Sequence, residues 1–298
     1  MKLKQTWIVI TISIGFSILS NAQQEPRSAF FWNNYMHTNP AMTGAIYQHQ
    51  ANVQWRNQWV NTNGAPTTLW ANYAMKLDSI NSGVGVSYEY DVIGLNRSHT
   101  ALLSYAYHLP IKKMCLSVGA SAGLKTMRLD ASELVFSTPV PAYETRNYNP
   151  VFQCDLGVAL HAERWNVGIS VTQLNGAKFK DPYLPYKNAA HLWVFADYTF
   201  LLGEKWKLTP RLQSYSDGKT LCSTLAAVAT WKERLWFGGT ASVPVNQGSY
   251  NIGPMIGYDI AGKFRLGYAY EFRIVKYTPS SPIGNDGSHE LILSYQLR

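Results

Sequence analysis

Charged side chains recur at alternate positions of otherwise apolar segments. In the segment 264–273, Arg265, Glu271 and Arg273 share one face of a predicted strand with small residues, and large apolar or aromatic residues share the other. This sorting follows because successive side chains of a strand point to opposite faces. Both signs of charge occur, which allows ion pairs between neighbouring strands, and a solvated inner wall explains them better than a selectivity filter does. The predicted interior set is Glu89, Asp91, Lys125, Asp155, Asp197, Arg211, Asp259, Arg265, Glu271 and Arg273.

No residue spacing in the sequence is typical of an enzyme or a metal site. The seven histidines are scattered, without an HExxH motif or paired cysteines, and there is no Gly-x-Ser-x-Gly motif. A serine and an aspartate lie close to His289, but Glu290 follows at the start of a strand, so a polar cluster that opens the strand is the simpler interpretation. We expect no catalytic residue, no cofactor and no metal site. Nor do we expect a disulfide framework from the three cysteines, because their number is odd and two fall near opposite ends of neighbouring strands.

The elements that must position the charges are short strands. Segments with a period of two, bounded by turn residues, predict about 14 antiparallel strands. A charge that faces lipid costs about 2–4 kcal/mol at the membrane midplane, so the charged face must line the interior of a closed barrel. The predicted strands are 48–57, 66–76, 83–91, 99–108, 114–125, 151–162, 164–173, 190–202, 205–215, 220–231, 233–243, 249–259, 262–273 and 288–297.

The predicted connections alternate in length. The odd-numbered ones are long, as at 126–150, 174–189 and 274–287, and the even-numbered ones are tight, as at Glu163 and Lys232. Outer-membrane barrels show this asymmetry, with short periplasmic turns and long outside loops. Only 15% of residues are charged, while 19 tyrosines and 10 tryptophans could occupy two membrane interfaces. We therefore predict an all-β fold, a transmembrane outer-membrane β-barrel over residues 48–298.

The segments before the barrel have different compositions. Residues 1–22 combine a positively charged start, an apolar run and small residues at the end, which predicts a cleaved secretory signal peptide. Residues 23–47 do not alternate and contain Phe30, Phe31, Trp32, Tyr35 and Met36. We expect this segment to fold into the barrel mouth as a partial plug or to pack against its rim, and a flexible periplasmic arm is the alternative. The net charge of +8 is spread out and gives no patch for nucleic acid.

Several short motifs resemble the PorP/SprF family. They are Asn39-Pro40-Ala41-Met42-Thr43-Gly44, Arg56-Asn57-Gln58-Trp59, Gly64-Ala65-Pro66-Thr67-Thr68, Asp91-Val92-Ile93-Gly94, Tyr105-Ala106-Tyr107, Gly267-Tyr268-Ala269-Tyr270 and Gly287-Ser288-His289-Glu290. The ordered set spans essentially the whole mature chain. The resemblance implies an outer-membrane barrel of the type IX secretion system of Bacteroidetes, which assists export of a large secreted adhesin or enzyme, or holds its C-terminal domain at the cell surface. It also implies a role in gliding motility for some members.

The long loops are the surfaces we expect to contact such a partner. Tyrosine offers a large contact area with little loss of entropy. The predicted contact residues are Trp59, Tyr143, Tyr148, Tyr183, Tyr186 and Tyr277. Besides the secreted substrate and outer-membrane lipid, periplasmic components of the secretion machine are candidate partners at the short turns. A channel or transporter for hydrophobic substrates is the alternative function.

Overall fold

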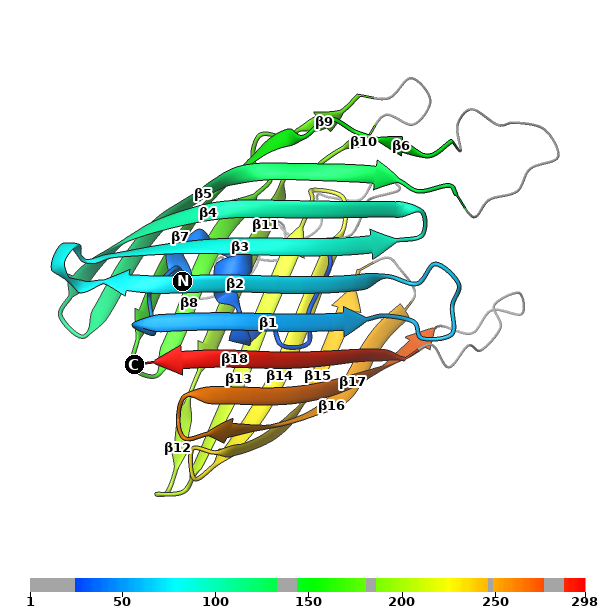
Figure 1. Cartoon of the computed structure of the whole chain (residues 1–298). Helices are drawn as coiled ribbons and strands as arrows, with labels where there is room; N and C mark the ends of the chain where they lie inside the picture. The colour runs from blue at the N-terminus through cyan, green and yellow to red at the C-terminus, as the bar shows by residue number, and fades with distance from the viewer. Residues whose placement is uncertain (1–24, 133–143, 181–185, 246–248, 276–286, 298) are drawn as a thin grey trace, which may run out of the picture.

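Fourteen strands form one closed antiparallel barrel (Figure 1), which confirms the predicted fold class and strand number. The computed structural model describes residues 25–132, 144–180, 186–245, 249–275 and 287–297. The wall strands are β1 His49–Asn57, β2 Thr67–Leu77, β3 Ser82–Ile93, β4 Asn96–Ile111, β5 Met114–Leu129, β7 Val151–Ala162, β8 Trp165–Thr172, β11 His191–Tyr198 with its continuation β12 Phe200–Leu202, β13 Trp206–Ser216, β14 Leu221–Trp231, β15 Leu235–Pro244, β16 Ser249–Ile260, β17 Phe264–Val275 and β18 Ser288–Leu297.

The first and last strands close the barrel. β1 pairs antiparallel with β18, with His49 opposite Leu297 and Asn57 opposite His289. Every other wall strand pairs with its neighbours along the chain. Over the described residues, the wall therefore leaves no unpaired strand edge, which is the condition for crossing a bilayer with strands.

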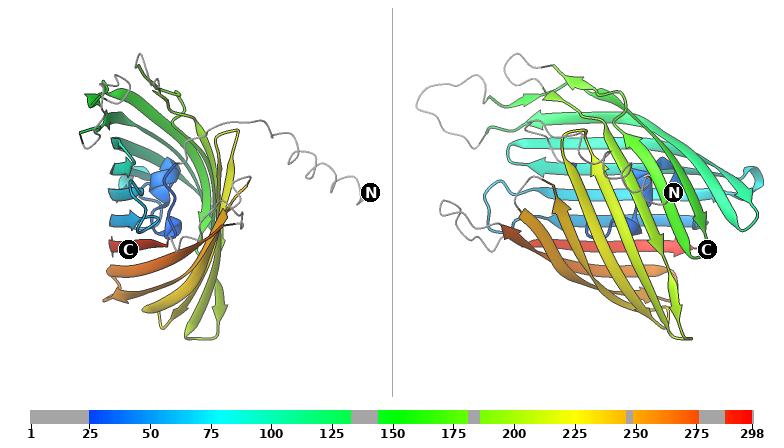
Figure 2. Two further views of the ribbon diagram at one scale, coloured as in Figure 1. Left: turned by 90° about the vertical axis from the view of Figure 1, so that its right-hand side faces the viewer. Right: turned by 180° about the vertical axis from the view of Figure 1, so that it is seen from behind.

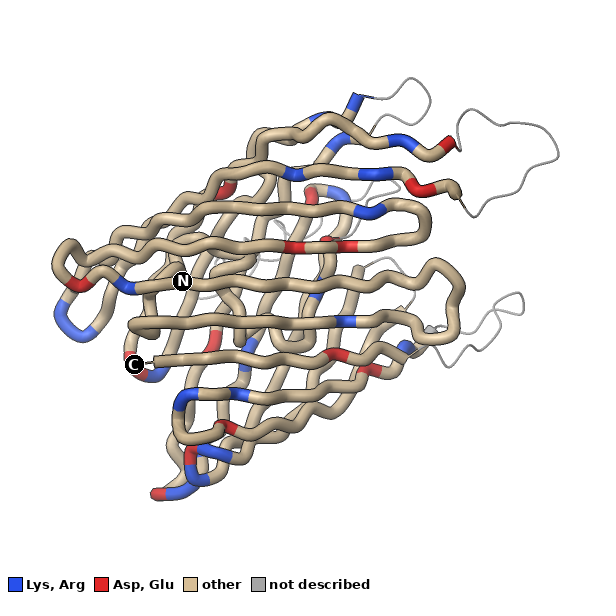
Figure 3. The backbone as a smooth tube through the Cα atoms, viewed as in Figure 1, with Lys and Arg blue, Asp and Glu red and all other residues tan. Residues whose placement is uncertain are grey.

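The two faces of the wall differ in character, as the period of two predicts. On β17, the side chains of Phe264, Leu266 and Phe272 are exposed, whereas Ala269 and Glu271 are buried. The outer face of the barrel is thus a band of large apolar and aromatic side chains, suited to lipid. Strands β1 to β4 carry few charged residues, and most of the length of each strand is uncharged (Figure 3). Among the described residues, no helix is both long and apolar enough to cross a membrane.

The connections alternate in length less regularly than the sequence predicts. Strands β3 and β4 run further than expected and are joined through residues 94–95 alone. Gly94 adopts a φ of +57°, a conformation that permits a two-residue hairpin turn and that other residues seldom adopt. The odd-numbered connection 217–220 is also short, so only some outside connections are long. Two long connections carry short strands that the sequence did not predict: β6 Arg146–Asn147, β9 Lys178–Phe179 and β10 Tyr186–Lys187.

Residues 25–47, called the N-terminal segment below, lie inside the ring of strands (Figure 2). They form three short turns of helix: η1 Phe31–Asn33, α2 Tyr35–Thr38 and η2 Pro40–Met42. Phe30 and Trp32 belong to one buried cluster with Phe195 of β11 and Trp236 of β15. The ring centroids of Trp32 and Trp236 are 5.4 Å apart in a T-shaped arrangement. The aromatic side chains of the N-terminal segment are thus buried in the barrel interior.

Candidate functional site

Glu290 of β18 links the N-terminal segment to the wall. Its carboxylate accepts hydrogen bonds from the backbone N–H of Ala29, at 2.9 Å, and of Phe30, at 3.2 Å. Arg56 of β1 donates to the same carboxylate at 2.6 Å and also pairs with Glu271 of β17. Arg56 is 0% exposed and both glutamates are 1% exposed, so the three charges are removed from water together. One arginine from the first strand thus joins two carboxylates from the last two strands.

Two of the predicted interior charges form an ion pair between neighbouring strands. Asp197 of β11 lies directly opposite Arg211 of β13, with 3.6 Å between the Arg211 Nη1 and Asp197 Oδ2 atoms. The Tyr35 hydroxyl of the N-terminal segment donates to Asp197 at 2.6 Å. The Tyr35 ring also stacks on Phe195, with the ring centroids 4.2 Å apart. Asp197 therefore binds both Tyr35 of helix α2 and Arg211 of the neighbouring strand.

Two more of the predicted interior residues, Arg265 and Asp259, support the aromatic cluster. Arg265 of β17 makes two hydrogen bonds to Asp259 of β16, at 2.8 and 2.7 Å. The indole N–H of Trp236 donates to the same carboxylate at 3.1 Å. The guanidinium of Arg265 also lies over the Trp32 ring, 5.3 Å from its centroid. The pair thus fixes the position of the wall tryptophan against which the N-terminal segment packs.

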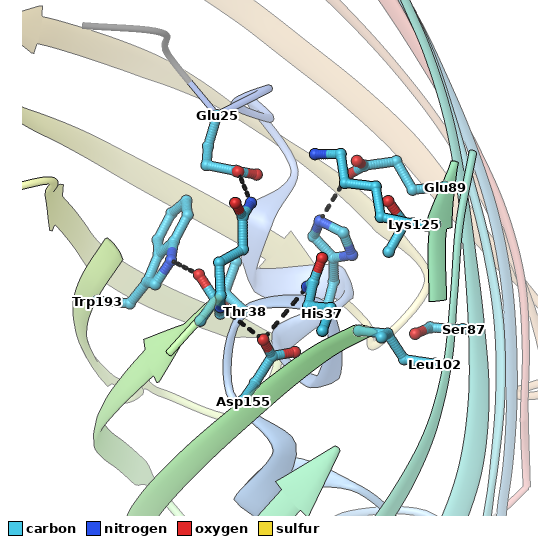
Figure 4. A pocket seen from close by; sticks show the side chains of 13 residues that line it. Glu25, His37, Thr38, Ser87, Glu89, Leu102, Lys125, Asp155 and Trp193 are labelled. Atoms are coloured by element: carbon cyan, nitrogen blue, oxygen red, sulfur yellow. Dashed lines mark hydrogen bonds and ion pairs between the residues drawn. The ribbon is translucent and has the colours of Figure 1, made fainter. Parts of the chain in front are cut away.

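Three more predicted interior charges line a pocket beside α2 (Figure 4). His37 donates from Nε2 to Glu89 of β3 at 3.2 Å, and the Trp70 indole donates to Glu89 at 2.8 Å. Asp155 of β7 accepts from the backbone N–H of Gln173 at 2.7 Å. Lys125 of β5 lines the same pocket, so predicted residues from β3, β5 and β7 meet there. Asp91, one inward position further along β3, accepts a hydrogen bond from the Thr68 hydroxyl at 2.7 Å.

The Asn39-Pro40 motif fits against glycines of the wall. The Asn39 side-chain amide donates to the carbonyl oxygen atoms of Val158, at 3.1 Å, and of Ile169, at 3.2 Å. A Cβ atom on Gly157 would lie 2.0 Å from Asn39 Oδ1, and one on Gly119 would lie 2.5 Å from the Pro40 carbonyl carbon. Only glycine leaves room for the close approach of the Asn39 side chain and of the Pro40 backbone to these strands. The glycines of β5 and β7 thus form a seat for the N-terminal segment, called the glycine seat below.

A cavity of about 300 Å³ opens at the end of the barrel that carries the long connections. This volume is in the range of small-ligand pockets and accommodates a few side chains of a partner. Its lining combines aromatic and apolar side chains with charges of both signs. The lining includes Arg27, Trp59, Pro66, Asp91, Lys125, Met127, Tyr186 and His191.

The predicted contact residues occupy different environments. Trp59 and Tyr186 line the cavity, and the guanidinium of Arg273 lies over the Trp59 ring, 4.8 Å from its centroid. Tyr148 is only 9% exposed and belongs to a buried loop cluster with Phe179. The predicted residues Tyr143, Tyr183 and Tyr277, like the predicted signal peptide, lie outside the described residues. Within the described part of the chain, the cavity therefore brings together Trp59 and Tyr186.

Ionisation in the N-terminal segment depends on the wall charges. Burial alone would lower the pKa of His37, but the hydrogen bond and the negative charge of Glu89 outweigh it, and the pKa is raised. Burial raises the pKa of Tyr35 well above its ordinary value, and the charge of Asp197 raises it further. Tyr35 is therefore a neutral hydrogen-bond donor, whereas His37 favours its cationic form beside Glu89.

The raised pKa of His37 predicts that the N-terminal segment is held more weakly at alkaline pH. The stabilisation is fully present below the unfolded pKa, about 6.5, and is lost as the pH rises through the higher folded value. We expect protease cleavage within residues 25–47 to accelerate as the pH is raised from about 6.5 upwards. His37→Gln should flatten this dependence, and His99→Gln on the exposed face of β4 should preserve it. An unchanged pH profile in His37→Gln would contradict the assignment.

The comparisons with known proteins agree with this architecture. The family model described as "Type IX secretion system membrane protein PorP/SprF" matches residues 20–295, which confirms the resemblance seen in the short motifs. The search of curated proteins gives no match.

Solved structures with a similar fold are outer-membrane proteins. The Acinetobacter baumannii outer membrane protein Omp33 aligns with a TM-score of 0.50 at 12% identity, covering 86% of this chain and 100% of that one. The CymD monoaromatic hydrocarbon channel has a TM-score of 0.53 at 13% identity, covering 88% and 91%. The P. putida toluene transporter TodX has a TM-score of 0.53 at 10% identity, covering 88% and 92%. At such identities the likeness shows the barrel fold.

Proposed function

Because the chain belongs to the type IX secretion system membrane protein PorP/SprF family, we propose that this outer-membrane barrel binds a secreted partner at its long-connection end and assists its export or holds it at the cell surface. The cavity lined by Trp59 and Tyr186 is the observation that carries the proposal. The partner is a large adhesin or enzyme, engaged through its C-terminal domain. In gliding cells, such a partner would connect the barrel to motility.

The shape of the interior supports binding at the mouth rather than passage through the lumen. The N-terminal segment crosses the interior and contacts strands from widely separated parts of the wall, from β1 and β18 to β7 and β11. A partner segment would therefore enter the cavity and stop at this packed layer. Aromatic side chains at the cavity rim are the residue types that most often dominate interface energies.

Substitution of the cavity aromatics tests the proposal. With the C-terminal domain of a large secreted protein that co-purifies with the barrel, Trp59→Ala and Tyr186→Ala should each weaken binding to the purified barrel about 30-fold, the effect of losing about 2 kcal/mol at an interface hot spot. Trp231→Ala, a tryptophan exposed at the opposite end of the barrel, is the matched control and should bind normally. Retained affinity in both cavity variants would exclude this cavity as the binding surface.

Recovery from native membranes tests the broader proposal. We expect the barrel, extracted in mild detergent, to co-purify with one large secreted protein. Its recovery without such a partner under several growth conditions would refute the anchoring role.

A channel for hydrophobic solutes is the second candidate, because apolar side chains contribute to the cavity and the similar structures CymD and TodX are described as a channel and a transporter. Planar-bilayer recordings distinguish the two functions. A stable, solute-selective conductance of the barrel alone would favour the channel, and a silent barrel would favour partner binding.

A further inference from the structure

Three side chains with metal-binding atoms converge inside the barrel near the short-turn ends of β4, β5 and β7. The candidate ligand atoms of His108, Cys115 and His161 all lie within 4.8 Å of one another. The strand register explains the convergence, because Cys115 is directly opposite His161 and His108 is directly opposite Ser117. The cluster lies apart from the cavity proposed for partner binding and from the charges that hold helix α2.

Hydrogen bonds orient both imidazole rings toward one point. His108 Nε2 is 3.0 Å from the carbonyl oxygen of Thr43 in the N-terminal segment, so Nε2 carries the proton and donates it. The other ring nitrogen, Nδ1, is then an acceptor and lies 2.7 Å from the Ser117 hydroxyl. His161 Nε2 lies 3.1 Å from the same hydroxyl on its other side. Metal-binding histidines typically donate the second ring N–H to a carbonyl in this way, because the bond fixes the tautomer and the ring orientation.

We propose that His108 Nδ1, Cys115 Sγ and His161 Nε2 bind a thiophilic transition-metal ion, with Zn²⁺ as the best match. Two imidazoles and one thiolate are ligands that such ions prefer, whereas Mg²⁺ and Ca²⁺ require oxygen ligands. Three protein ligands leave one position of a tetrahedral site for water. On binding, the Cys115 thiol loses its proton to solvent, and the His161 proton moves to Nδ1.

The surroundings of the cluster permit this binding. Cys115 is a free cysteine that is partly exposed, so an ion can reach its sulfur. Lys76, whose charge acts on all three groups, is itself paired with Asp78 at 2.8 Å between Nζ and Oδ1. Because His108 also holds Thr43, an ion in this site would tie the N-terminal segment to the wall from the side opposite to Glu290.

Metal titration of the full chain, purified in detergent and stripped with a chelator, tests the proposal. Co²⁺ alone should bind with a stoichiometry of one and produce the absorption of a thiolate-to-cobalt charge transfer, and added Zn²⁺ should displace it. Cys115→Ser should abolish this absorption. Cys154→Ser and Cys222→Ser, which change the other two cysteines, are the matched controls and should retain it. No charge-transfer absorption in the wild type, or absorption that persists in Cys115→Ser, would overturn the site.

A second measurement does not depend on the thiolate. Zn²⁺ should raise the unfolding temperature of the wild-type barrel, and His161→Asn should weaken Zn²⁺ binding by at least about tenfold. An equal shift of the unfolding temperature in wild type and His161→Asn would also overturn the site. Neither outcome bears on partner binding, because the variants leave Trp59 and Tyr186 unchanged.

Discussion

Arg56→Ala should destabilise the barrel more than removal of any exposed charge. The substitution leaves Glu271 and Glu290 buried without the arginine that pairs with both, and leaves Arg27 at 4.0 Å from Glu271. Breaking a buried ion pair by removing one partner costs about 3–5 kcal/mol, because the stranded charge stays desolvated. The free energy of unfolding into denaturant, measured for the barrel in lipid vesicles, should fall by this amount.

The matched control for Arg56 is Arg128→Ala. Arg128 is about half exposed and lies 3.9 Å from Asp130, so its removal should cost less than about 1 kcal/mol. The double variant Arg56→Ala with Glu290→Gln should be less destabilised than the sum of the single variants, because it leaves fewer unpaired charges. Equal effects of Arg56→Ala and Arg128→Ala would show that the buried network contributes nothing.

Substitution of the glycine seat should release the N-terminal segment without disturbing the wall. Valine is a good strand residue, but its Cβ at Gly119 would lie 2.5 Å from backbone atoms of Pro40 and Ala41. Overpacking of this kind costs about 1–3 kcal/mol per site, and Gly119→Val combined with Gly157→Val would act on the same short segment. We expect the double variant to expose residues 25–47 to protease and to conduct ions in planar bilayers.

Gly239→Val is the control for the glycine seat. The atom nearest to a Cβ at Gly239 is the Gly253 carbonyl oxygen, at an ordinary distance of 3.5 Å. This variant should remain protease-resistant within residues 25–47 and show the conductance of the wild type. If the double variant of the glycine seat behaves like Gly239→Val, the segment does not depend on these contacts.

The two faces of the wall could be predicted from the sequence, because alternate residues of a strand point to opposite faces. Phe264 and Leu266 are exposed and Glu271 is buried, as that rule requires. The ends of β3 and β4 were not predictable to the residue, since alternation continues up to the turn and the turn depends on one glycine, Gly94.

The sequence predicted which face of each strand carries the interior charges, but not which residues these charges pair with. Arg56 and Glu290 appear in the sequence only as parts of short motifs, and nothing local shows that the first and last strands bring them together. The cluster of His108, Cys115 and His161 was missed for the same reason, because its three members come from three strands. The one available signal was that Glu290 is a carboxylate on the inward side of an apolar strand.

The position of Glu290 has a consequence for how the chain folds. The carboxylate that receives the N–H groups of Ala29 and Phe30 stands on the last strand, separated from them by 261 and 260 residues. Contacts between such distant parts of a chain form late, because the intervening chain must first be ordered. The hydrogen bonds from Ala29 and Phe30 to Glu290 can therefore form only after β18 is in place. A barrel that lacks β18 would lack these hydrogen bonds, and residues 25–47 should be more easily cleaved by protease. Protease resistance of this segment would therefore indicate that the last strand is in place.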